Sequence, residues 1–292
     1  MSTQSPMADN EAGAGRLGGT VIIGGDMPVH RLGFGAMRLC GPGVWGEPAD
    51  PAQAKGVLKR VLELGITLID TADAYGPEVN ERLIAETLHP YPEEIVIATK
   101  GGLTRPRRES WDRNGRPEHL RAACEASLRR LKLQRIDLYQ LHAPDPRVPI
   151  EDSVGALVDL QAAGKIRHIG LSNVNVDELR QARQIARIVS VQNRYNLSDR
   201  SSEGVLAECE REGIAFLPWR PLEAGGHGTG ALATVARRHG ATPVQVAIAW
   251  LLARSPVMAP IPGTRASGRE RRSRAAAAVG RRSTRLVLTL GS

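Results

Sequence analysis

The chain has 292 residues, of which 41% are hydrophobic and 3% aromatic, and it carries a formal net charge of +8. This length can bury one large core, and the absence of any run of about 18 apolar residues excludes a membrane-spanning helix. Cys40, Cys124 and Cys209 are too few and too scattered for a disulfide framework or a zinc site, so we expect no metal, and reduced thiols in a cytoplasmic protein.

The first 19 residues differ in composition from the rest of the chain. They are rich in Gly, Ala, Ser and Asn, and they lack the basic start and apolar block of a secretory signal. We therefore expect residues 1–19 to form a disordered lead-in.

From residue 20 onwards one theme repeats, in which a short apolar run is followed by a polar loop and then by a longer segment with helical spacing. Strands are expected at Val29–Met37, Thr67–Asp70, Ile95–Thr99, Asp137–Leu141, Ile166–Leu171, Val189–Gln192, Ala215–Pro218 and Val257–Ile261. Helices are expected near 51–64, 79–88, 117–131, 151–163, 176–186, 202–212 and 231–254. This alternation predicts a parallel sheet closed into a (β/α)8 TIM barrel over residues 20–264.

Helix-stop and helix-start signals in the sequence support these boundaries. Gly65, Gly164 and Gly213 each stand where a helix must end before the next strand. The segment 231–254 contains Gly240 and then Thr242-Pro243, which predicts one helix stop followed by a new helix start.

Four polar residues stand at or just past the ends of predicted strands. Asp70 and Tyr75 lie in Asp70-Thr-Ala-Asp-Ala-Tyr75, Lys100 follows Ile95–Thr99, and His142 follows Asp137–Leu141. The ends of parallel barrel strands converge on one face, so these four side chains can share one site.

Two Gly-x-Gly-x-x-Gly matches do not carry a dinucleotide fingerprint. The match at 13–18 has no strand before it, and the match at 41–46 does not open a helix directly, although the fingerprint needs strand, turn and helix start together. We interpret residues 41–46 as a loop over the barrel mouth. Trp45 is either a wall of the substrate pocket or part of ordinary loop packing.

Several short motifs follow one another in order on the predicted strands: Leu32-Gly-Phe-Gly-Ala-Met37, Asp70-Thr-Ala-Asp-Ala-Tyr-Gly76, Ala98-Thr-Lys100, Asp137-Leu-Tyr-Gln-Leu-His142, Gly170-Leu-Ser-Asn173, Val191-Gln-Asn193, Tyr195-Asn196 and Ile261-Pro-Gly-Thr264. Taken together, they resemble the aldo-keto reductase family from about Arg31 to Thr264. Gly41-Pro-Gly-Val-Trp-Gly46, His89-Pro-Tyr-Pro92 and Leu217-Pro-Trp-Arg-Pro-Leu222 resemble more narrowly a bacterial subgroup that includes pyridoxal reductases.

The resemblance implies a catalytic tetrad in an NADPH-dependent reductase that converts an aldehyde or ketone to an alcohol. Tyr75 would donate a proton to the carbonyl oxygen. A free tyrosine has a pKa of about 10, and we expect Lys100 to lower it because a nearby ammonium favours the phenolate. Asp70 would hold Lys100 charged and oriented, and His142 would orient the carbonyl.

Cofactor-binding residues are also implied by the resemblance, with NADPH as the expected cofactor and NADH as a possible one. Ser172, Asn173 and Gln192 would bond the nicotinamide carboxamide, and Trp219 would stack on the nicotinamide ring. Pro221, Leu222 and Gly225-Gly226 match the loop over the pyrophosphate. Thr264 and Arg265 are candidates for the 2′-phosphate end, with Arg269 as a further one, although a solvated tail is an equally good interpretation of both arginines.

Residues 265–292 depart from the family pattern. Residues 263–292 contain eight arginines and one acid, so they carry +7 of the total of +8, and no apolar stripe at helical spacing runs through residues 264–285. We expect the eighth helix of the barrel to be missing or altered. Our hypothesis is an out-of-frame reading of a GC-rich gene or a recently diverged end, with reduced stability or oligomerisation as its consequence.

Two other functions stay open at this stage. The altered end favours a nucleotide-binding regulatory homologue with weak turnover. The arginine-rich tail suggests a nucleic-acid binder, but it lacks interleaved aromatic residues, so we expect no nucleic-acid partner.

The identity of the substrate depends on barrel-top loops around 38–48, 103–116 and 143–149. Arg105, Arg107 and Arg108 there could bind an acidic substrate or belong to a mobile charged loop. The oligomeric state and the reaction's direction are left open.

Overall fold

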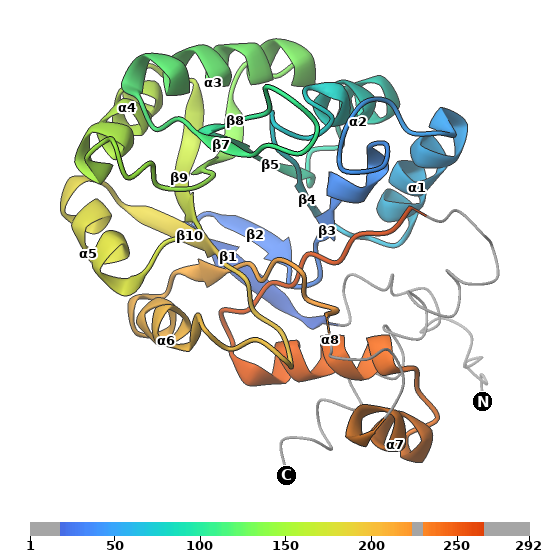
Figure 1. Cartoon of the computed structure of the whole chain (residues 1–292). Coiled ribbons are helices and arrows are strands. Elements are labelled where there is room, and N and C mark those ends of the chain that lie inside the picture. Colours follow the sequence, from blue (N-terminus) through green and yellow to red (C-terminus); the bar gives the residue numbers. More distant parts are fainter. Residues whose placement is uncertain (1–17, 224–229, 266–292) are drawn as a thin grey trace, which may run out of the picture.

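The computed structural model describes residues 18–223 and 230–265. Residues 1–17 of the expected lead-in (1–19), the Gly225-Gly226 loop, and residues 266–292 of the expected altered end (265–292), with Arg269, lie outside them. Parallel strands form a seven-stranded sheet in the order β11-β10-β9-β8-β5-β4-β3, and helices surround it (Figure 1). The strands are β3 (Phe34–Gly35), β4 (Leu68–Asp70), β5 (Val96–Gly101), β8 (Ile136–Leu141), β9 (Ile166–Ser172), β10 (Ile188–Gln192) and β11 (Ala215–Phe216). The helices are α1 (Pro51–Glu63), α2 (Val79–Leu88), α3 (Pro117–Leu131), α4 (Ile150–Ala162), α5 (Val176–Ile185), α6 (Glu203–Glu212), α7 (Ala231–Arg238) and α8 (Pro243–Arg254).

The expected eighth strand closes the sheet into a barrel. Its Met258 pairs in parallel with Phe216 of β11, and Ala259 N donates to Phe216 O at 2.8 Å. On the other side, Gly33 N donates to Pro260 O at 3.0 Å and Gly35 N donates to Pro262 O at 3.1 Å. Proline has no N–H to donate, which explains why this segment makes isolated bonds rather than a regular ladder.

The closing seam depends on two glycines. A Cβ atom added to Gly35 would lie 2.6 Å from Ile261 O, and one added to Gly263 would lie 2.3 Å from Gly35 O. A larger residue at either position would push the first and last strands apart. The Gly-x-Gly pattern around Gly35 and the Pro-Gly pair around Gly263 therefore belong to barrel closure.

The predicted helix boundaries are confirmed by their caps. The Asp50 side chain accepts from Gln53 N at 2.8 Å, directly before Pro51. Thr242 and Gln245 form a reciprocal capping box at the start of α8, which confirms the predicted break in 231–254. Gly65, Gly164 and Gly213 all follow helices and adopt positive φ, as the stop signals require.

The expected strand Val29–Met37 is wrong in its extent. The chain instead forms an N-terminal antiparallel hairpin of β1 (Thr20–Ile23) and β2 (Met27–His30), then turns before the short β3, and enters the 3-10 helix η2 (Ala36–Leu39). A second hairpin, β6 (Leu103–Thr104) with β7 (Asp112–Arg113), was also not expected. The strands of β6–β7 have two residues each and are too short to show strand periodicity in the sequence.

Two apolar layers hold the barrel together. Inside it, β-strand residues such as Leu68, Ala98 and Leu138 pack against Ile23 and Met27 of the hairpin β1–β2, which covers one end of the barrel. Between sheet and helices, larger clusters bury side chains of α1–α6. None of the helices in residues 18–223 and 230–265 is both long and apolar enough to cross a bilayer.

Candidate active site

The four residues expected to form a tetrad come together at the carboxyl ends of β4, β5 and β8. Asp70 ends β4, Lys100 lies near the end of β5, and His142 follows β8 directly. Lys100 Nζ donates to both carboxylate oxygens of Asp70, each at 2.8 Å, and to Thr71 O at 2.8 Å. Both side chains are buried, so this ion pair lies in a region of low dielectric constant.

Tyr75 and His142 complete the cluster. The Tyr75 hydroxyl lies 3.5 Å from Lys100 Nζ, and its ring is edge-to-face with the His142 ring at a centroid distance of 5.7 Å. His142 Nδ1 and Gln140 Oε1 are buried and have no hydrogen-bond partner among the described residues. The buried polar atoms of the site therefore include unpaired positions that a ligand could satisfy.

The expected effect of Lys100 on Tyr75 needs a correction. Burial and, next, the Asp70 carboxylate raise the pKa of the Tyr75 hydroxyl well above its ordinary value. The Lys100 ammonium favours the phenolate, but it is engaged by two Asp70 oxygens and lies farther from the hydroxyl, so burial outweighs it and the net shift is opposite to the predicted direction. Tyr75 consequently keeps its proton at neutral pH, as a proton donor must.

Burial also acts on the two other titratable groups. It lowers the pKa of Lys100 although Asp70 opposes this effect, and it lowers the pKa of His142 well below its usual value, with the Lys100 charge adding to the effect. His142 is therefore neutral at physiological pH. A neutral imidazole presents one donor and one acceptor to a substrate.

The three expected carboxamide-binding residues form a row along the same rim. Ser172 ends β9, Asn173 follows it with φ of 58°, and Gln192 ends β10. Asn173 Nδ2 donates to His142 O at 2.9 Å, and Gln192 Nε2 donates to Asp70 Oδ1 at 2.8 Å. The row is thus connected directly to the tetrad.

Trp219 stands beside this row. Its Nε1 donates to Asn173 Oδ1 at 3.0 Å, and the guanidinium groups of Arg194 and Arg220 each lie 5.7 Å from its ring centroid. The indole is half-buried, so part of its surface is open. This bond occupies the amide oxygen of Asn173, a detail that the sequence does not indicate.

The remaining cofactor candidates lie apart from the tetrad. Leu222 packs with Leu32, Ile248 and Leu252, which anchors the chain after the buried Pro221. Thr264 and Arg265 are exposed, and Arg265 Nε donates to the carbonyl oxygen of Arg38 at 3.2 Å. The Arg265 side chain therefore lies against the backbone after β3, where the described chain ends.

Sequence reasoning missed one aromatic residue of the site. The Trp111 ring lies edge-to-face with Tyr75 at 6.3 Å and with His142 at 6.5 Å between centroids. Arg105 is buried rather than part of a mobile loop, and it stacks on Trp111 and lies near Trp45. The loop 103–116 was expected to line the pocket, but no sequence signal distinguished Trp111 within it.

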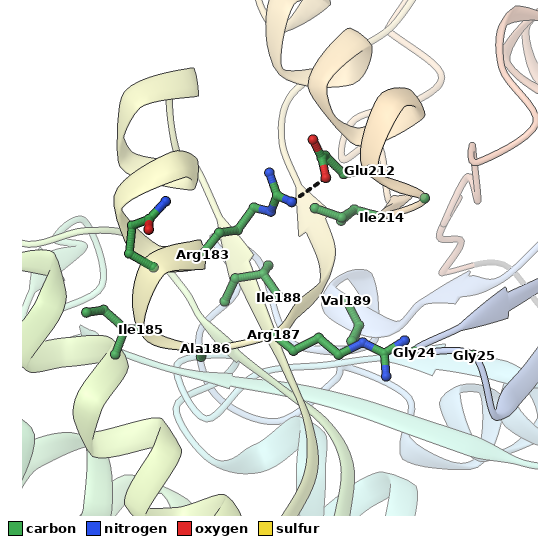
Figure 2. A pocket seen from close by; sticks show the side chains of 12 residues that line it. Gly24, Gly25, Arg183, Ile185, Ala186, Arg187, Ile188, Val189, Glu212 and Ile214 are labelled. Carbon is green, nitrogen blue, oxygen red and sulfur yellow. Dashed lines mark hydrogen bonds and ion pairs between the residues drawn. The ribbon is translucent and has the colours of Figure 1, made fainter.

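The barrel also has a hollow of about 450 Å³ at its opposite end, shown in Figure 2. It is lined by the hairpin tip at Gly24 and Gly25, by residues 183–189 before and at the start of β10, and by residues 212–214 before β11. These are the amino ends of the strands, and in α/β barrels this face contributes to stability rather than to catalysis. Arg183 in this hollow is paired with Glu212 and Glu208, so it is already neutralised.

No group of three His, Cys, Asp or Glu side chains that could hold a metal ion occurs in the described part of the chain. The three cysteines are free and buried. Polar and aromatic side chains at the carboxyl ends of the strands make up the candidate site. In α/β barrels this face carries the active site, so the fold and the site together indicate an α/β barrel enzyme.

The model of the Aldo/keto reductase family matches residues 31–281, and the chain belongs to this family. An uncharacterized oxidoreductase of Schizosaccharomyces pombe is 49% identical over 249 residues, covering 84% of this chain and 80% of that protein. Pyridoxine 4-dehydrogenase of Escherichia coli is 43% identical over 249 residues, covering 82% of this chain and 86% of its own length. The family expected from the motifs is thereby confirmed.

Solved structures agree with the fold. A glycerol dehydrogenase of Gluconobacter oxydans superposes with a TM-score of 0.79 at 26% identity, covering 94% of this chain and 95% of that chain. An aldo-keto reductase of Klebsiella pneumoniae, solved in complex with NADPH, superposes with a TM-score of 0.74 at 25% identity, with 89% of each chain covered. The expected α/β barrel is confirmed, while the expected change in its eighth helix falls outside the described residues.

Proposed function

We propose that this protein reduces an aldehyde or ketone to an alcohol with NADPH, with Tyr75 as the general acid. The observation that carries this proposal is the buried contact between Asp70, Lys100 and the Tyr75 hydroxyl, which sets a protonated phenol beside a fixed ammonium group. An isolated barrel tyrosine would need neither partner. A proton donor held in a preorganised, water-poor site fits carbonyl reduction.

Each member of the tetrad has a separate task in this reaction. Tyr75 gives its proton to the carbonyl oxygen as negative charge develops there. Lys100 stabilises the phenolate that remains, and Asp70 keeps Lys100 charged despite its burial. His142 is neutral and orients the carbonyl by a hydrogen bond.

The residues of the rim fit a nicotinamide cofactor. A carboxamide both donates and accepts hydrogen bonds, as do the Ser172 hydroxyl and the Asn173 and Gln192 amides next to the tetrad. A bound carboxamide would share or replace the bonds that the Asn173 amide makes to His142 O and Trp219 Nε1. Trp219 offers a flat ring on the same rim. When bound, NADPH supplies the hydride, and the protein supplies position and the proton.

We assign the 2′-phosphate end of the cofactor to Arg265, with Thr264 beside it. Arg265 is exposed and lies against the backbone of Arg38, so a phosphate there would meet its guanidinium group. Arginine binds phosphate through a planar fork of donors. Pro221 and Leu222 are proposed to hold the chain that covers the pyrophosphate.

Pyridoxal is the substrate to test first. The Escherichia coli relative is named pyridoxine 4-dehydrogenase, which points to the same pair of aldehyde and alcohol for this chain. We expect the reaction to take place in the cytoplasm, since Cys40, Cys124 and Cys209 are all free thiols.

Cofactor titration and turnover test the proposal. Binding of NADPH and NADH to the full chain is followed by fluorescence, and NADPH consumption is then measured with a panel of aldehydes that includes pyridoxal. We expect tight NADPH binding, and loss of turnover in Tyr75→Phe with binding retained. Arg265→Met should weaken binding of NADPH about tenfold and leave NADH unchanged, because only NADPH carries the 2′-phosphate.

The same binding and turnover measurements also test the alternative function, a nucleotide-binding regulatory homologue with weak turnover. Tight NADPH binding without turnover of any aldehyde would make the chain a nucleotide-binding homologue. Failure to bind either nucleotide would overturn the reductase proposal altogether. Turnover that survives in Tyr75→Phe would remove Tyr75 from its assigned role.

A further inference from the structure

Arg105 is an arginine buried among carbonyl groups rather than paired with acids. Arg105 is 7% exposed, and no carboxylate in the described part of the chain forms an ion pair with it. Its terminal nitrogens donate to Val44 O at 3.1 Å, Gly43 O at 3.2 Å, Ala74 O at 3.5 Å and Arg108 O. These donors are therefore not available to an acidic substrate.

The carbonyl partners of Arg105 come from separate segments of the barrel top. Gly43 and Val44 belong to the loop over the barrel mouth, and Ala74 directly precedes Tyr75. The mouth loop is also tied to the residue after Tyr75, because Gly76 N donates to Val44 O at 3.2 Å and Gly46 N donates to Gly76 O at 2.8 Å. Arg105 thus connects the mouth loop with the loop that carries the proposed acid.

The flat face of Arg105 contacts the indole rings. Its guanidinium carbon lies 3.7 Å from the Trp111 ring centroid and 5.5 Å from that of Trp45. Stacking of a guanidinium on an aromatic ring is favourable, and it strengthens where water is excluded. A lysine cannot reproduce this arrangement, because it has no planar fork.

Trp111, held in this way, faces the reacting groups. Its ring is edge-to-face with both Tyr75 and His142, with interplanar angles of 73° in each case. It is also 38% exposed, so part of an indole that lies next to the Tyr75 ring is open. A planar ligand whose carbonyl meets Tyr75 can therefore pack its ring on this indole.

We propose that Arg105 is a positioning residue that holds Trp111 as a flat wall of the substrate pocket, so that the pocket selects planar aromatic aldehydes over small aliphatic ones. This inference rests on the reductase function proposed above. Arg105 acts through Trp111 and does not itself contact the carbonyl.

The test compares benzaldehyde with propanal as substrates of the full chain, with NADPH held saturating. Arg105→Met should lower kcat/KM for benzaldehyde about tenfold, mainly through KM, and change that for propanal less than about threefold, since only the aromatic ring uses the wall. Trp111→Ala should give the same selective loss, and Trp111→Phe should restore part of the preference. Arg107→Met, an exposed residue of the same loop, is the matched control and should leave both substrates unchanged.

A double variant separates positioning from a general structural role. If Arg105 acts through Trp111, then kcat/KM for benzaldehyde should be the same in Arg105→Met/Trp111→Ala as in Trp111→Ala alone, since both changes remove the same wall of the pocket. Equal losses for both aldehydes, or additive losses in the double variant, would overturn the inference. Thermal melts and NADPH binding verify that each variant folds.

Failure of the proposed function would look different. In that case the wild-type chain would reduce neither aldehyde, or Tyr75→Phe would remain active, and the assignment of Arg105 would fall with the reductase proposal. A wild-type enzyme that needs Tyr75 but shows the same benzaldehyde-to-propanal ratio in Arg105→Met would overturn the Arg105 inference alone.

Discussion

At the scale of single residues, the buried pair of Lys100 and Asp70 explains how the candidate site keeps a charge in a dry environment. Asp70 accepts hydrogen bonds from Lys100 and Gln192, so its carboxylate is compensated on more than one side. Removing one partner of a buried ion pair leaves an unpaired charge, which is strongly destabilising. Activity and stability are therefore coupled at these two residues.

Substitution of Lys100 separates these two effects. Lys100→Met should lower kcat at least about a hundredfold, because the phenolate of Tyr75 loses its stabilising charge. It should also lower the free energy of unfolding by about 3 kcal/mol, since Asp70 is left unpaired. The double variant Asp70→Asn/Lys100→Met should regain most of that stability but none of the activity. Stopped-flow kinetics and urea denaturation measure the two quantities, and recovery of activity in the double variant would contradict this account.

At the scale of elements, the junction between β3, α8 and the eighth strand closes the barrel. Arg31, in the turn before β3, donates to Met258 O at 3.0 Å and to Leu252 O at 2.8 Å. It also donates to Ser255 O, so one guanidinium holds the end of α8 and the start of the last strand. Its burial lowers the pKa of its guanidinium, yet the group stays charged at any ordinary pH.

Loss of the hydrogen bonds from Arg31 should destabilise the whole barrel. Arg31→Met should lower the free energy of unfolding by about 2 to 3 kcal/mol, because several carbonyls lose a charged donor in a partly buried place. Arg187→Met is the matched control, since Arg187 is exposed at the other end of the barrel, and its effect should stay within about 0.5 kcal/mol. Identical urea midpoints for the two variants would show that Arg31 does not close the barrel.

The helices and strands also show which elements local sequence patterns can predict. The boundaries of α2 and α3 agree with their predicted ranges, because helical periodicity and stop signals are local. The hairpin β6–β7 could not be predicted, because two residues per strand leave no period to detect. It nevertheless lies in the loop that carries Trp111, so the missed element and the missed site residue belong together.

At the scale of the whole molecule, the two ends of the barrel differ in role. The carboxyl ends of the strands carry the polar candidate site, and the hairpin β1–β2 covers the amino ends. Asp26 at the tip of this hairpin contacts His168 at 2.6 Å and Arg167 at 2.9 Å, both on β9. These contacts lower the pKa of the Asp26 carboxyl, the Arg167 bond contributing most.

The stability of the molecule should depend on pH through His142. Its pKa is lowered in the folded state, whereas in the unfolded chain it is near 6.5, so the unfolded chain takes up the proton first as the pH falls. Stability should therefore be lost below about pH 6.5, by up to about 1.4 kcal/mol per pH unit for this one group. His142→Gln should show a shallower loss between about pH 7 and pH 5 in denaturant titrations.

The slope in that variant should not vanish, because the half-buried His119 also has a pKa lowered by burial and remains in place. The informative quantity is the difference between the wild-type and His142→Gln slopes, because burial raises the pKa of the Asp73 carboxyl and protonation of that group in the folded state acts in the opposite direction. A His142→Gln slope equal to that of the wild type would assign the effect to other histidines.

The sequence alone determined the alternation of strands and helices and the positions of Asp70, Tyr75, Lys100 and His142 at strand ends, because periodicity is local and parallel strand ends must converge. Only the tertiary structure decided the direction of the pKa of Tyr75, since burial and the distance to each charge do not follow from residue order. It also brought Arg105 onto Trp111 and closed the barrel at Gly35. These contacts depend on where backbone carbonyls point after packing, which no local pattern records.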